Sequence, residues 1–461
     1  MSRELSAANY CCCLAPPRSC AFCRIFLSFF HVFHLRSIPF LCKTAIHSSS
    51  YHSFYSITCT AATMLGSLTS NTTAGDGGGS EGSAGSCHQH DSNLHPAAGP
   101  IFSSFPARQL LIHCADLVHR GDLLASDRAV TLLLSAANAG ADDATDRLVR
   151  QFCRALSLRI AGRPAAAASS AAYFLFNQIA PFLRFAHLTA NQAILEAVAG
   201  RRRIHILDLD AHHGLQWPPL LQAIATAGGR PPSVRITGAG SDFETLRRTG
   251  DRLTAFARSF HLDFDFRPLL LLPKHRPHRP TTLDQLHLDH TETMAVNCVL
   301  FLHKLQKEEE LLSFLTTLKA INPAVVTVAE REMPPASDVS PNSIHQFAAA
   351  VEYYSAMFES LEATLPPSSR ERSEVEHSWL GREIQTVVAG REVHRWSERW
   401  EIAMRTVGFR NIPPSRFAVS QGKMLLRLHY PAEGYEMEVV KEGFCFLGWK
   451  NKPLFSVSSW H

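Results

Sequence analysis

Cysteine is scarce beyond the first 63 residues of the chain, and this scarcity excludes a fold held together by disulfides. Seven of the 12 cysteines lie within residues 1–63. The other five are Cys87, Cys114, Cys153, Cys298 and Cys445. Cysteines spaced this widely form neither a disulfide framework nor a CxxC metal pattern. The spacing therefore favours a reducing compartment, and the sequence predicts no metal site.

The main part of the chain also lacks a charge excess of either sign. The 461 residues carry a net charge of +4, and residues 1–63 account for it with five basic residues against one acid. A neutral body lacks the basic face with which non-specific nucleic-acid binders hold phosphates, so direct DNA binding is disfavoured. No run of about 18 apolar residues occurs either, so no membrane-spanning helix is predicted.

Residues 1–63 differ in kind from the rest of the chain. They are rich in Ser, Phe, Cys and His and nearly free of acids, which is typical of an organelle transit peptide. We favour instead a start at Met64, with residues 1–63 lying upstream of it or forming a disordered tail. Residues 64–105 are rich in Gly and Ser and cannot bury a core, so they are predicted to be disordered. Organellar delivery by residues 1–63 is the alternative.

Residues 106–199 show the spacing of amphipathic helices. Leu110, Leu117 and Leu124 fall seven residues apart, but Gly121-Asp122 interrupts them before the three or four heptads that a coiled coil needs. A helical hairpin that packs on its own domain is therefore favoured over a leucine zipper.

The following helices are marked by polar caps and by proline. Asp127 is predicted to cap the second helix. Residues 146–160 place apolar side chains three and four apart and predict one buried stripe. Pro181 is predicted to kink or break the helix over residues 173–199.

After residue 203 the pattern changes to short β-type runs that alternate with helices. This alternation predicts crossover connections and a mostly parallel sheet. The expected strands are 204–208, 233–238, 262–266, 294–302 and 323–329, and the expected helices begin at Pro218-Pro219, at Phe243 and at Glu308. Runs at 424–429, 444–449 and 454–460 predict antiparallel strands at one edge. The fold class is therefore α/β, and it resembles a Rossmann-like methyltransferase core with an N-terminal helical cap.

The loop after Asp208 argues against methyltransferase chemistry. Such a loop reads D-x-G-x-G-x-G, because glycines let backbone N–H groups approach the ligand. Here Asp210 and His212 occupy the first two glycine positions, and Gly214 alone is present. The second strand ends at Gly238 without an acid directly at its tip to hold ribose hydroxyls. These departures predict a fold whose catalytic site has been lost.

A set of collinear motifs resembles the plant-specific GRAS family. Ile204-His205-Ile206-Leu207-Asp208, followed by His213, Gly214, Gln216 and Trp217, resembles its VHIID motif. Pro323, Glu330-Arg331-Glu332, Tyr353-Tyr354 and Arg382-Glu383 are similar to its PFYRE region, and Trp449 and Ser458-Ser459-Trp460 to its SAW region. Two positions depart from the family pattern: Ser459 replaces an alanine, and His213 stands where many members carry an amide.

The resemblance divides the domain of residues 106–461 into five parts. They are a first leucine-rich region (106–199), a VHIID-like part (200–230), a second leucine-rich region (240–272), a PFYRE-like part (292–392) and a SAW-like part (393–461). Residues 177–197 are similar to the Lateral suppressor/Monoculm subgroup of this family.

The resemblance implies a nuclear, non-enzymatic transcriptional regulator that promotes axillary meristem formation and shoot branching (tillering). Its partners would be DNA-binding transcription factors and other GRAS proteins, with DNA contacted indirectly; no cofactor or membrane contact is implied, and a dimer is left open. The predicted partner interface comprises Leu110, Leu117, Leu124, Leu246, Leu253 and Phe260. The alternative is a small-molecule-binding or residual methyltransferase-like protein that uses a pocket above Asp208 and Gly238.

Most motif side chains also have a structural interpretation, which we favour. Asp208 is predicted to cap a turn or helix, His205 to lie satisfied in the core, and His212-His213 to lack metal partners. The tryptophans Trp217, Trp449 and Trp460 are expected to pack in the core or at an edge. One of Tyr353-Tyr354 is expected to face the core, and Arg382-Glu383 to be solvated or paired with neighbouring side chains on their helix. The basic stretch 274–279 is predicted to be a solvated loop, with a nuclear-import or phosphate patch as its alternative.

Overall fold

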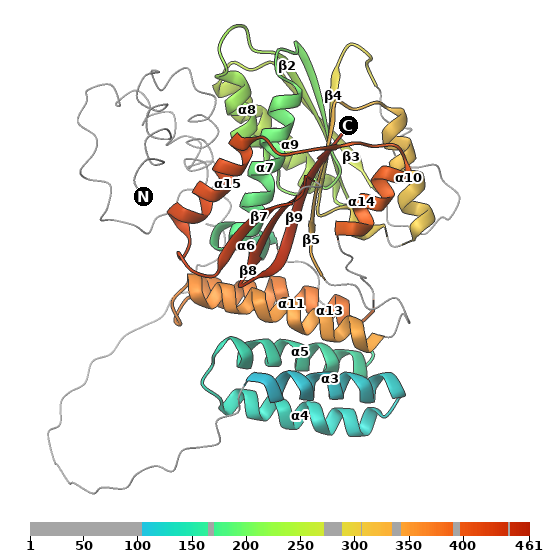
Figure 1. The fold of residues 1–461 in the computed structure, drawn as a ribbon, viewed down its shortest axis with the longest axis vertical. Helices are drawn as coiled ribbons and strands as arrows, with labels where there is room; N and C mark the ends of the chain where they lie inside the picture. Colours follow the sequence, from blue (N-terminus) through green and yellow to red (C-terminus); the bar gives the residue numbers. More distant parts are fainter. Residues whose placement is uncertain are drawn as a thin grey trace, which may run out of the picture.

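The computed structural model describes residues 104–164, 170–271, 288–305, 307–333, 343–390, 397–440 and 443–461. An α/β part stands on two layers of helices, as Figure 1 shows. The expectations for residues 1–63, for most of 64–105 and for the basic stretch 274–279 lie outside the described residues.

The outermost helical layer comes from the first leucine-rich region. It consists of α3 (Ser104–Arg120), α4 (Leu123–Ala139) and α5 (Ala144–Ile160), which pack on one another. Gly121, at φ +81°, turns the chain between α3 and α4, as expected of an interrupted heptad pattern. The predicted cap at Asp127 is wrong. Asp122 caps α4 instead, because its side chain accepts the N–H of Ala125 at 3.1 Å.

The chain then enters the α/β part through α6 (Ser170–Ile179) and α7 (Pro181–Ala197). Pro181 separates the two helices, as predicted. Nearly all of α7 is buried, because it lies against β4, β5 and β9 and against α15.

The sheet combines parallel strands with an antiparallel edge, which confirms the predicted fold class. Its order is β3-β2-β1-β4-β5-β9-β8-β7, with β6 (Asn411–Ile412) paired to β9. The parallel strands are β1 (Arg203–Asp208), β2 (Ser233–Gly240), β3 (Phe264–Leu270), β4 (Thr293–Val299) and β5 (Val325–Arg331). The antiparallel strands are β7 (Tyr435–Val439), β8 (Cys445–Trp449) and β9 (Lys452–Trp460).

Helices cover both faces of the sheet, so the strands are apolar on both sides. One core joins α7 to α8 (Trp217–Ala225) and α9 (Phe243–Ser259). The opposite core joins the sheet to α10 (Glu308–Ala320) and α14 (Ser397–Thr406). A short 3₁₀ turn, η2 (Leu302–Lys304), precedes α10.

One predicted strand is a helix. Residues 424–429 belong to α15 (Arg416–His429). The Ser415 side chain caps the start of this helix by accepting the N–H of Ala418 at 3.1 Å. The apolar face of the helix then continues through residues 424–429.

A middle layer of helices lies between the sheet and the outer helices (Figure 1). It comprises α11 (Ser343–Thr364), α12 (Arg370–Glu374), the π-helix η3 (Val375–Leu380) and α13 (Gly381–Val388). Because α11 packs on α3 and α5 on one side and on β8 and β9 on the other, it is buried on two faces. Tyr353 and Tyr354 are therefore both buried, at 2% and 0% exposure, which corrects the expectation that one tyrosine alone faces the core.

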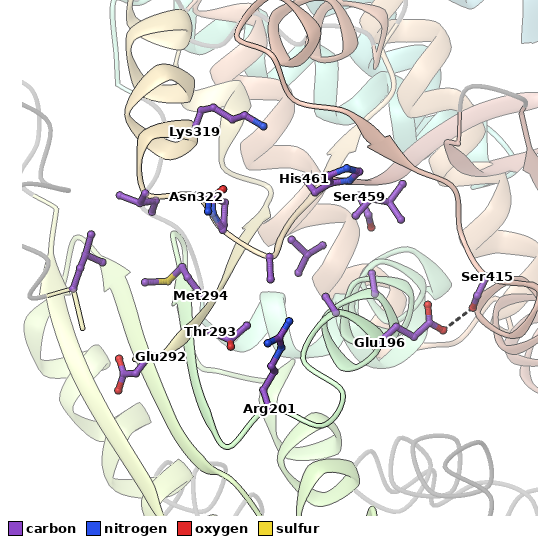
Figure 2. Close-up of a pocket in the computed structure, with 18 of the residues that line it drawn as sticks. Glu196, Arg201, Glu292, Thr293, Met294, Lys319, Asn322, Ser415, Ser459 and His461 are labelled. Carbon is purple, nitrogen blue, oxygen red and sulfur yellow. Dashed lines mark hydrogen bonds between the residues drawn. The ribbon is translucent and has the colours of Figure 1, made fainter. Parts of the chain in front are cut away.

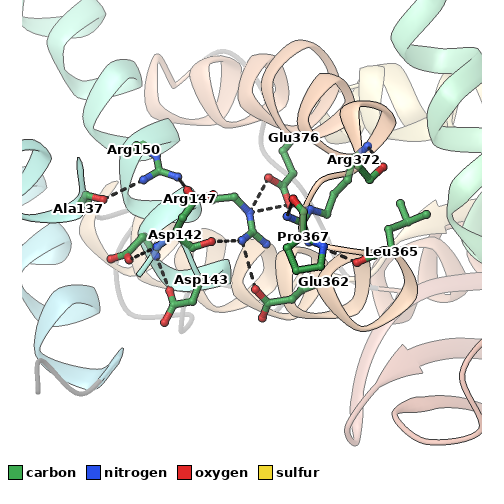
Figure 3. Close-up of polar contacts among 12 residues, drawn as sticks. Ala137, Asp142, Asp143, Arg147, Arg150, Glu362, Leu365, Pro367, Arg372 and Glu376 are labelled. Atoms are coloured by element: carbon green, nitrogen blue, oxygen red, sulfur yellow. Dashed lines mark hydrogen bonds and ion pairs between the residues drawn. The ribbon is translucent and has the colours of Figure 1, made fainter. Parts of the chain in front are cut away.

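A buried ionic network ties the outer layer to the middle layer (Figure 3). The Arg147 guanidinium on α5 donates from Nε to both Glu376 oxygens, at 3.2 and 2.9 Å, and from Nη1 to Glu362 at 3.2 Å. Arg372 lies on the other side of Glu376, with Nε 3.7 Å from Oε1. Arg147, Arg372 and Glu376 are all less than 9% exposed. The contact between α5 and η3 is thus made by buried charges that solvent screens weakly, whereas Glu362 on α11 is exposed.

Candidate functional site: the cavity at the carboxyl ends of the strands

The VHIID-like residues lie at the carboxyl ends of the central strands. The strand register places Gly238, Asp208, Asn297 and Thr327 in one row across β2, β1, β4 and β5. Ligands of open α/β folds bind beyond this edge of the sheet. The row is therefore the place to test for a functional site.

Asp208 is held by the protein itself. Its Oδ2 accepts the indole N–H of Trp217 at 2.8 Å, and its Oδ1 accepts Nδ2 of Asn297 at 3.0 Å. Burial raises the pKa of Asp208 to about 6, although these two hydrogen bonds favour the carboxylate. Asp208 is thus a structural acceptor, as the sequence indicated, and its donors include a tryptophan and an asparagine as well as the backbone N–H of Asp210 in the following turn.

The network behind Asp208 extends through further buried amides. Gln216 donates to Asn297 Oδ1 at 2.9 Å and to Asn191 Oδ1 at 3.1 Å, and Thr327 donates to Asn297 at 3.0 Å. All these side chains are at most 5% exposed. A fully connected polar network of this kind fixes one arrangement of α7, α8 and the sheet.

In the loop that follows β1, charged contacts of Asp210 and His212 stand where a methyltransferase loop has glycines. Asp210 Oδ2 lies 2.5 Å from Lys304 Nζ and 2.7 Å from His212 Nε2. Burial alone would raise the pKa of Asp210, but Lys304 and His212 lower it to about 2. His212 takes a left-handed conformation at φ +39°, and Gly214 follows at φ +64°. A Cβ at Gly214 would lie 2.7 Å from Thr249 Cγ2, so glycine is required there.

The depressed pKa of Asp210 predicts a pH-dependent stability. Ionised Asp210 stabilises the folded state above its unfolded pKa near 3.8, and this contribution is lost as pH falls toward 2. Asp210→Asn is expected to lower the free energy of unfolding by about 2 kcal/mol at pH 7, and the difference should shrink between pH 4 and pH 2. Urea unfolding at several pH values measures it. The exposed Asp251→Asn serves as control, and a pH-independent loss in Asp210→Asn would contradict the assignment.

Gly238 does not open space for a ligand. A Cβ there would lie 2.5 Å from Phe266 Cζ and 3.0 Å from Ala211 Cβ. Phe266 packs between β2 and α9, because a Cβ at Gly250 of α9 would also lie 2.5 Å from its ring. Asp210 and His212 stand where a methyltransferase loop carries glycines, so this loop departs from that of an S-adenosylmethionine site.

A cavity of about 310 Å³ nevertheless lies above this edge. Its floor includes Asp208, Asp210 and Asn297, and its roof comes from the helical layers. Tyr173 of α6 and Trp379 of η3 lie side by side, with ring centroids 5.4 Å apart and ring planes tilted by 57°, and the α13 residues Arg382 and Glu383 complete the wall.

The PFYRE-like residues form polar contacts between β5 and this roof. Glu383 is buried, whereas a solvated position or a pairing on its own helix was expected. Glu330 accepts the N–H of Leu302 at 2.6 Å and contacts His303 Nδ1 at 2.9 Å. Arg331 forms an ion pair with Glu383, and both are 7% exposed. The prediction that Glu383 is solvated or paired on its own helix is wrong, because Glu383 is buried against Arg331 at the end of β5.

The other predicted site residues are mostly core residues. Ile204, Ile206, Leu207, Trp217, Trp449 and Trp460 are at most 3% exposed. His205 is also buried, with Nε2 2.7 Å from the Thr237 hydroxyl, and burial lowers its pKa to about 4. His213 stacks near Phe174, with ring centroids 4.6 Å apart. Among the described residues no group of three or more His, Cys, Asp or Glu side chains has metal-site geometry.

A second, larger cavity lies at the opposite end of the sheet and includes Pro323. It measures about 1010 Å³ and is lined by the amino ends of β4 and β5 and by α7, α10 and the segment before α15. Figure 2 shows Glu196 and Arg201 on one side and Lys319 and Asn322 on the other. Its lining mixes both signs of charge and contains none of the VHIID-like motif.

The predicted partner leucines fall into two groups. Leu110 and Leu124, on the outer helices, are 46% and 77% exposed, and Leu117 is partly buried. Leu246 and Leu253 are 1% and 3% exposed, because α9 packs on β3. Phe260 is partly buried and lies 5.2 Å from Phe256 between ring centroids. Leu246 and Leu253 are therefore not accessible to a partner in this structure.

Comparison with known proteins decides the family. Residues 107–461 match the GRAS domain family. The chain belongs to the GRAS family. It is 52% identical over 389 residues to Protein MONOCULM 1 of Oryza sativa subsp. japonica, covering 77% of this chain and 88% of that protein. Scarecrow-like protein 18 of Arabidopsis thaliana is 41% identical over 408 residues, covering 77% and 91% respectively.

A solved structure supports the same assignment. The crystal structure of SCL7 in Oryza sativa matches this GRAS protein with a TM-score of 0.64 at 34% identity, over 77% of this chain and 99% of that one. The chain is thus a scarecrow-like, MONOCULM-like transcriptional regulator of the GRAS family. No helix within the described ranges is both long and apolar enough to cross a membrane.

The sequence did not reveal Asn297, Thr327, His187, Tyr173 or Trp379. For Asn297 and Thr327 a signal was available, because each is a polar residue inside an otherwise apolar strand. Tyr173 and Trp379 carried no such signal, since their approach depends on how the helical layers pack over the sheet.

Proposed function

We propose that this GRAS protein is a nuclear, non-enzymatic regulator that binds DNA-binding transcription factors and promotes axillary meristem formation and shoot branching. Its similarity to Protein MONOCULM 1 supports the developmental role. Asp210 and His212 replace two glycines of the methyltransferase loop, and Asp210 is paired with Lys304, which supports a non-enzymatic role. DNA is contacted through the partner, in keeping with the neutral body.

The observation that carries the proposal is a set of exposed leucines on the outer helical layer. On α4, Leu124 and Leu132 are 77% and 72% exposed, and Leu110 on α3 is 46% exposed. Figure 1 places α3 and α4 at the end of the molecule, away from the sheet. Leu124 and Leu132 are eight residues apart and so lie on one side of α4. These leucines are interspersed with the exposed Asp127 and Arg128, and a partner can cover such a mixed helix face.

The double substitution Leu124→Glu, Leu132→Glu is expected to abolish partner capture without unfolding the protein. Both side chains are exposed, so stability should change by no more than about 0.5 kcal/mol per site. Co-precipitation of the full chain from shoot nuclear extract, read by mass spectrometry, measures the loss of DNA-binding factors. Ile402→Glu on α14, at 57% exposure, is the matched control and should retain them.

Two results would contradict this proposal. The first is unchanged recovery of DNA-binding factors by the double variant. The second is tight, sequence-specific and steeply salt-dependent DNA binding by the purified chain without a partner, because the neutral body predicts no such affinity.

A further inference from the structure

The cavity at the carboxyl ends of the strands contains polar groups that the protein leaves without partners. His187 on α7 is 3% exposed, and its Nδ1 has no hydrogen-bond partner among the described residues. The indole Nε1 of Trp379 is also buried and has no partner in the described part of the chain. Both residues line the cavity. An unpaired buried polar atom costs about 1–3 kcal/mol, so a ligand that pairs with these two atoms gains hydrogen bonds that the described residues do not supply.

The backbone around this cavity is unusual as well. Trp379 lies on a π-helix, and such segments occur mostly at functional sites. His212 and Leu300 both line the cavity and both have positive φ, at 39° and 52°. A left-handed leucine is disfavoured and persists only where its surroundings hold it. These conformations cluster where the unpaired atoms lie.

The charges of the wall are already matched. Lys304 pairs with Asp210, and Arg331 pairs with Glu383. The Asp208 carboxylate is occupied by Trp217 and Asn297. A charged ligand would therefore have to displace one of these partners.

The free hydrogen-bonding capacity, in contrast, belongs to neutral groups. Burial lowers the pKa of His187 to about 3, so its imidazole is uncharged, and the Trp379 indole is a neutral donor. Tyr173 adds an aromatic ring beside Trp379, and the His212 ring lies on it with centroids 5.4 Å apart. The volume of about 310 Å³ lies at the lower end of the range for small-molecule sites.

We propose that this cavity binds an uncharged, planar heteroaromatic molecule of one or two rings, comparable to a nucleobase in size. The ring lies against Tyr173, and its hydrogen-bond acceptor receives the N–H of Trp379. This ligand class differs from S-adenosylmethionine, which is charged. The site is independent of the exposed leucines of α4, so it can be tested apart from partner binding.

The test is a titration of the full chain with adenine, followed by calorimetry and ligand-observed NMR at pH 7. Benzoate and S-adenosylmethionine are the charged comparison ligands. We expect adenine to bind saturably with a Kd of about 1 mM or tighter, and both charged compounds to bind more weakly. Trp379→Phe keeps the ring but removes the donor, and it is expected to weaken adenine binding about fivefold.

Trp400→Phe is the matched control, because Trp400 on α14 also has a buried indole nitrogen without a partner in the described residues but does not line this cavity. It should leave adenine binding unchanged. Tyr173→Leu gives an independent variant and should weaken binding about tenfold through loss of the ring face. Absence of saturable adenine binding, tighter binding of a charged compound, or equal weakening by Trp400→Phe would overturn the proposal.

Discussion

Replacing Arg147 with alanine is expected to lower the free energy of unfolding by about 3–5 kcal/mol, because the substitution leaves Glu376 buried without its main cation. Arg147 donates two hydrogen bonds to Glu376 and one to Glu362, and burial already raises the pKa of Glu376. Urea unfolding monitored by circular dichroism measures the loss.

Arg154 provides the matched control on the same helix. It is exposed and contacts His377 at 2.9 Å, so Arg154→Ala should cost at most about 1 kcal/mol. A double-mutant cycle between Arg147→Ala and Glu376→Gln should show strong coupling. Equal losses for Arg147→Ala and Arg154→Ala would show that the network does not hold the helical layers together.

Replacing Trp217 with alanine is expected to lower the free energy of unfolding by about 3–5 kcal/mol. The substitution leaves a cavity in the core, because the Trp217 side chain is 0% exposed. Trp217→Phe separates the two roles of this residue. It keeps most of the ring but removes the hydrogen bond to Asp208, and should cost about 1.5–3 kcal/mol at pH 7.

The phenylalanine variant should also change the pH dependence of stability. The folded pKa of Asp208 is raised to about 6, so ionising it costs stability as pH rises from about 4 through 6. Loss of the Trp217 donor raises this pKa further, so the deficit of Trp217→Phe should be larger at pH 7 than at pH 5. A deficit that is equal at both values would show that the carboxylate does not depend on this donor.

Much of the fold followed from local sequence patterns. The apolar strand ending at Asp208, the turn at Gly121 and the break at Pro181 are each determined by a few neighbouring residues, and each was predicted correctly. The run 424–429 was assigned as a strand because six apolar-rich residues do not distinguish a strand from one part of a helix. The cap at Ser415, nine residues earlier, is the signal that this run belongs to a helix.

The site was less predictable because its contacts are long-range. The position of Asp208 could be read from the motif, but its partner Asn297 lies 89 residues away, and the register of β1 and β4 brings them together. The burial of both Tyr353 and Tyr354 depends on packing against two separate layers. No periodicity within α11 contains that information.

The position of β9 has a consequence for biosynthesis. This strand ends at Trp460, yet it pairs with β5 and separates it from β8 in the finished sheet. A ribosome delivers the five parallel strands first and β9 last, so until then β5 presents an unpaired edge. Folding of this α/β part therefore requires β9 to insert between β5 and β8. A chain truncated before Lys452 leaves β5 without its antiparallel neighbour.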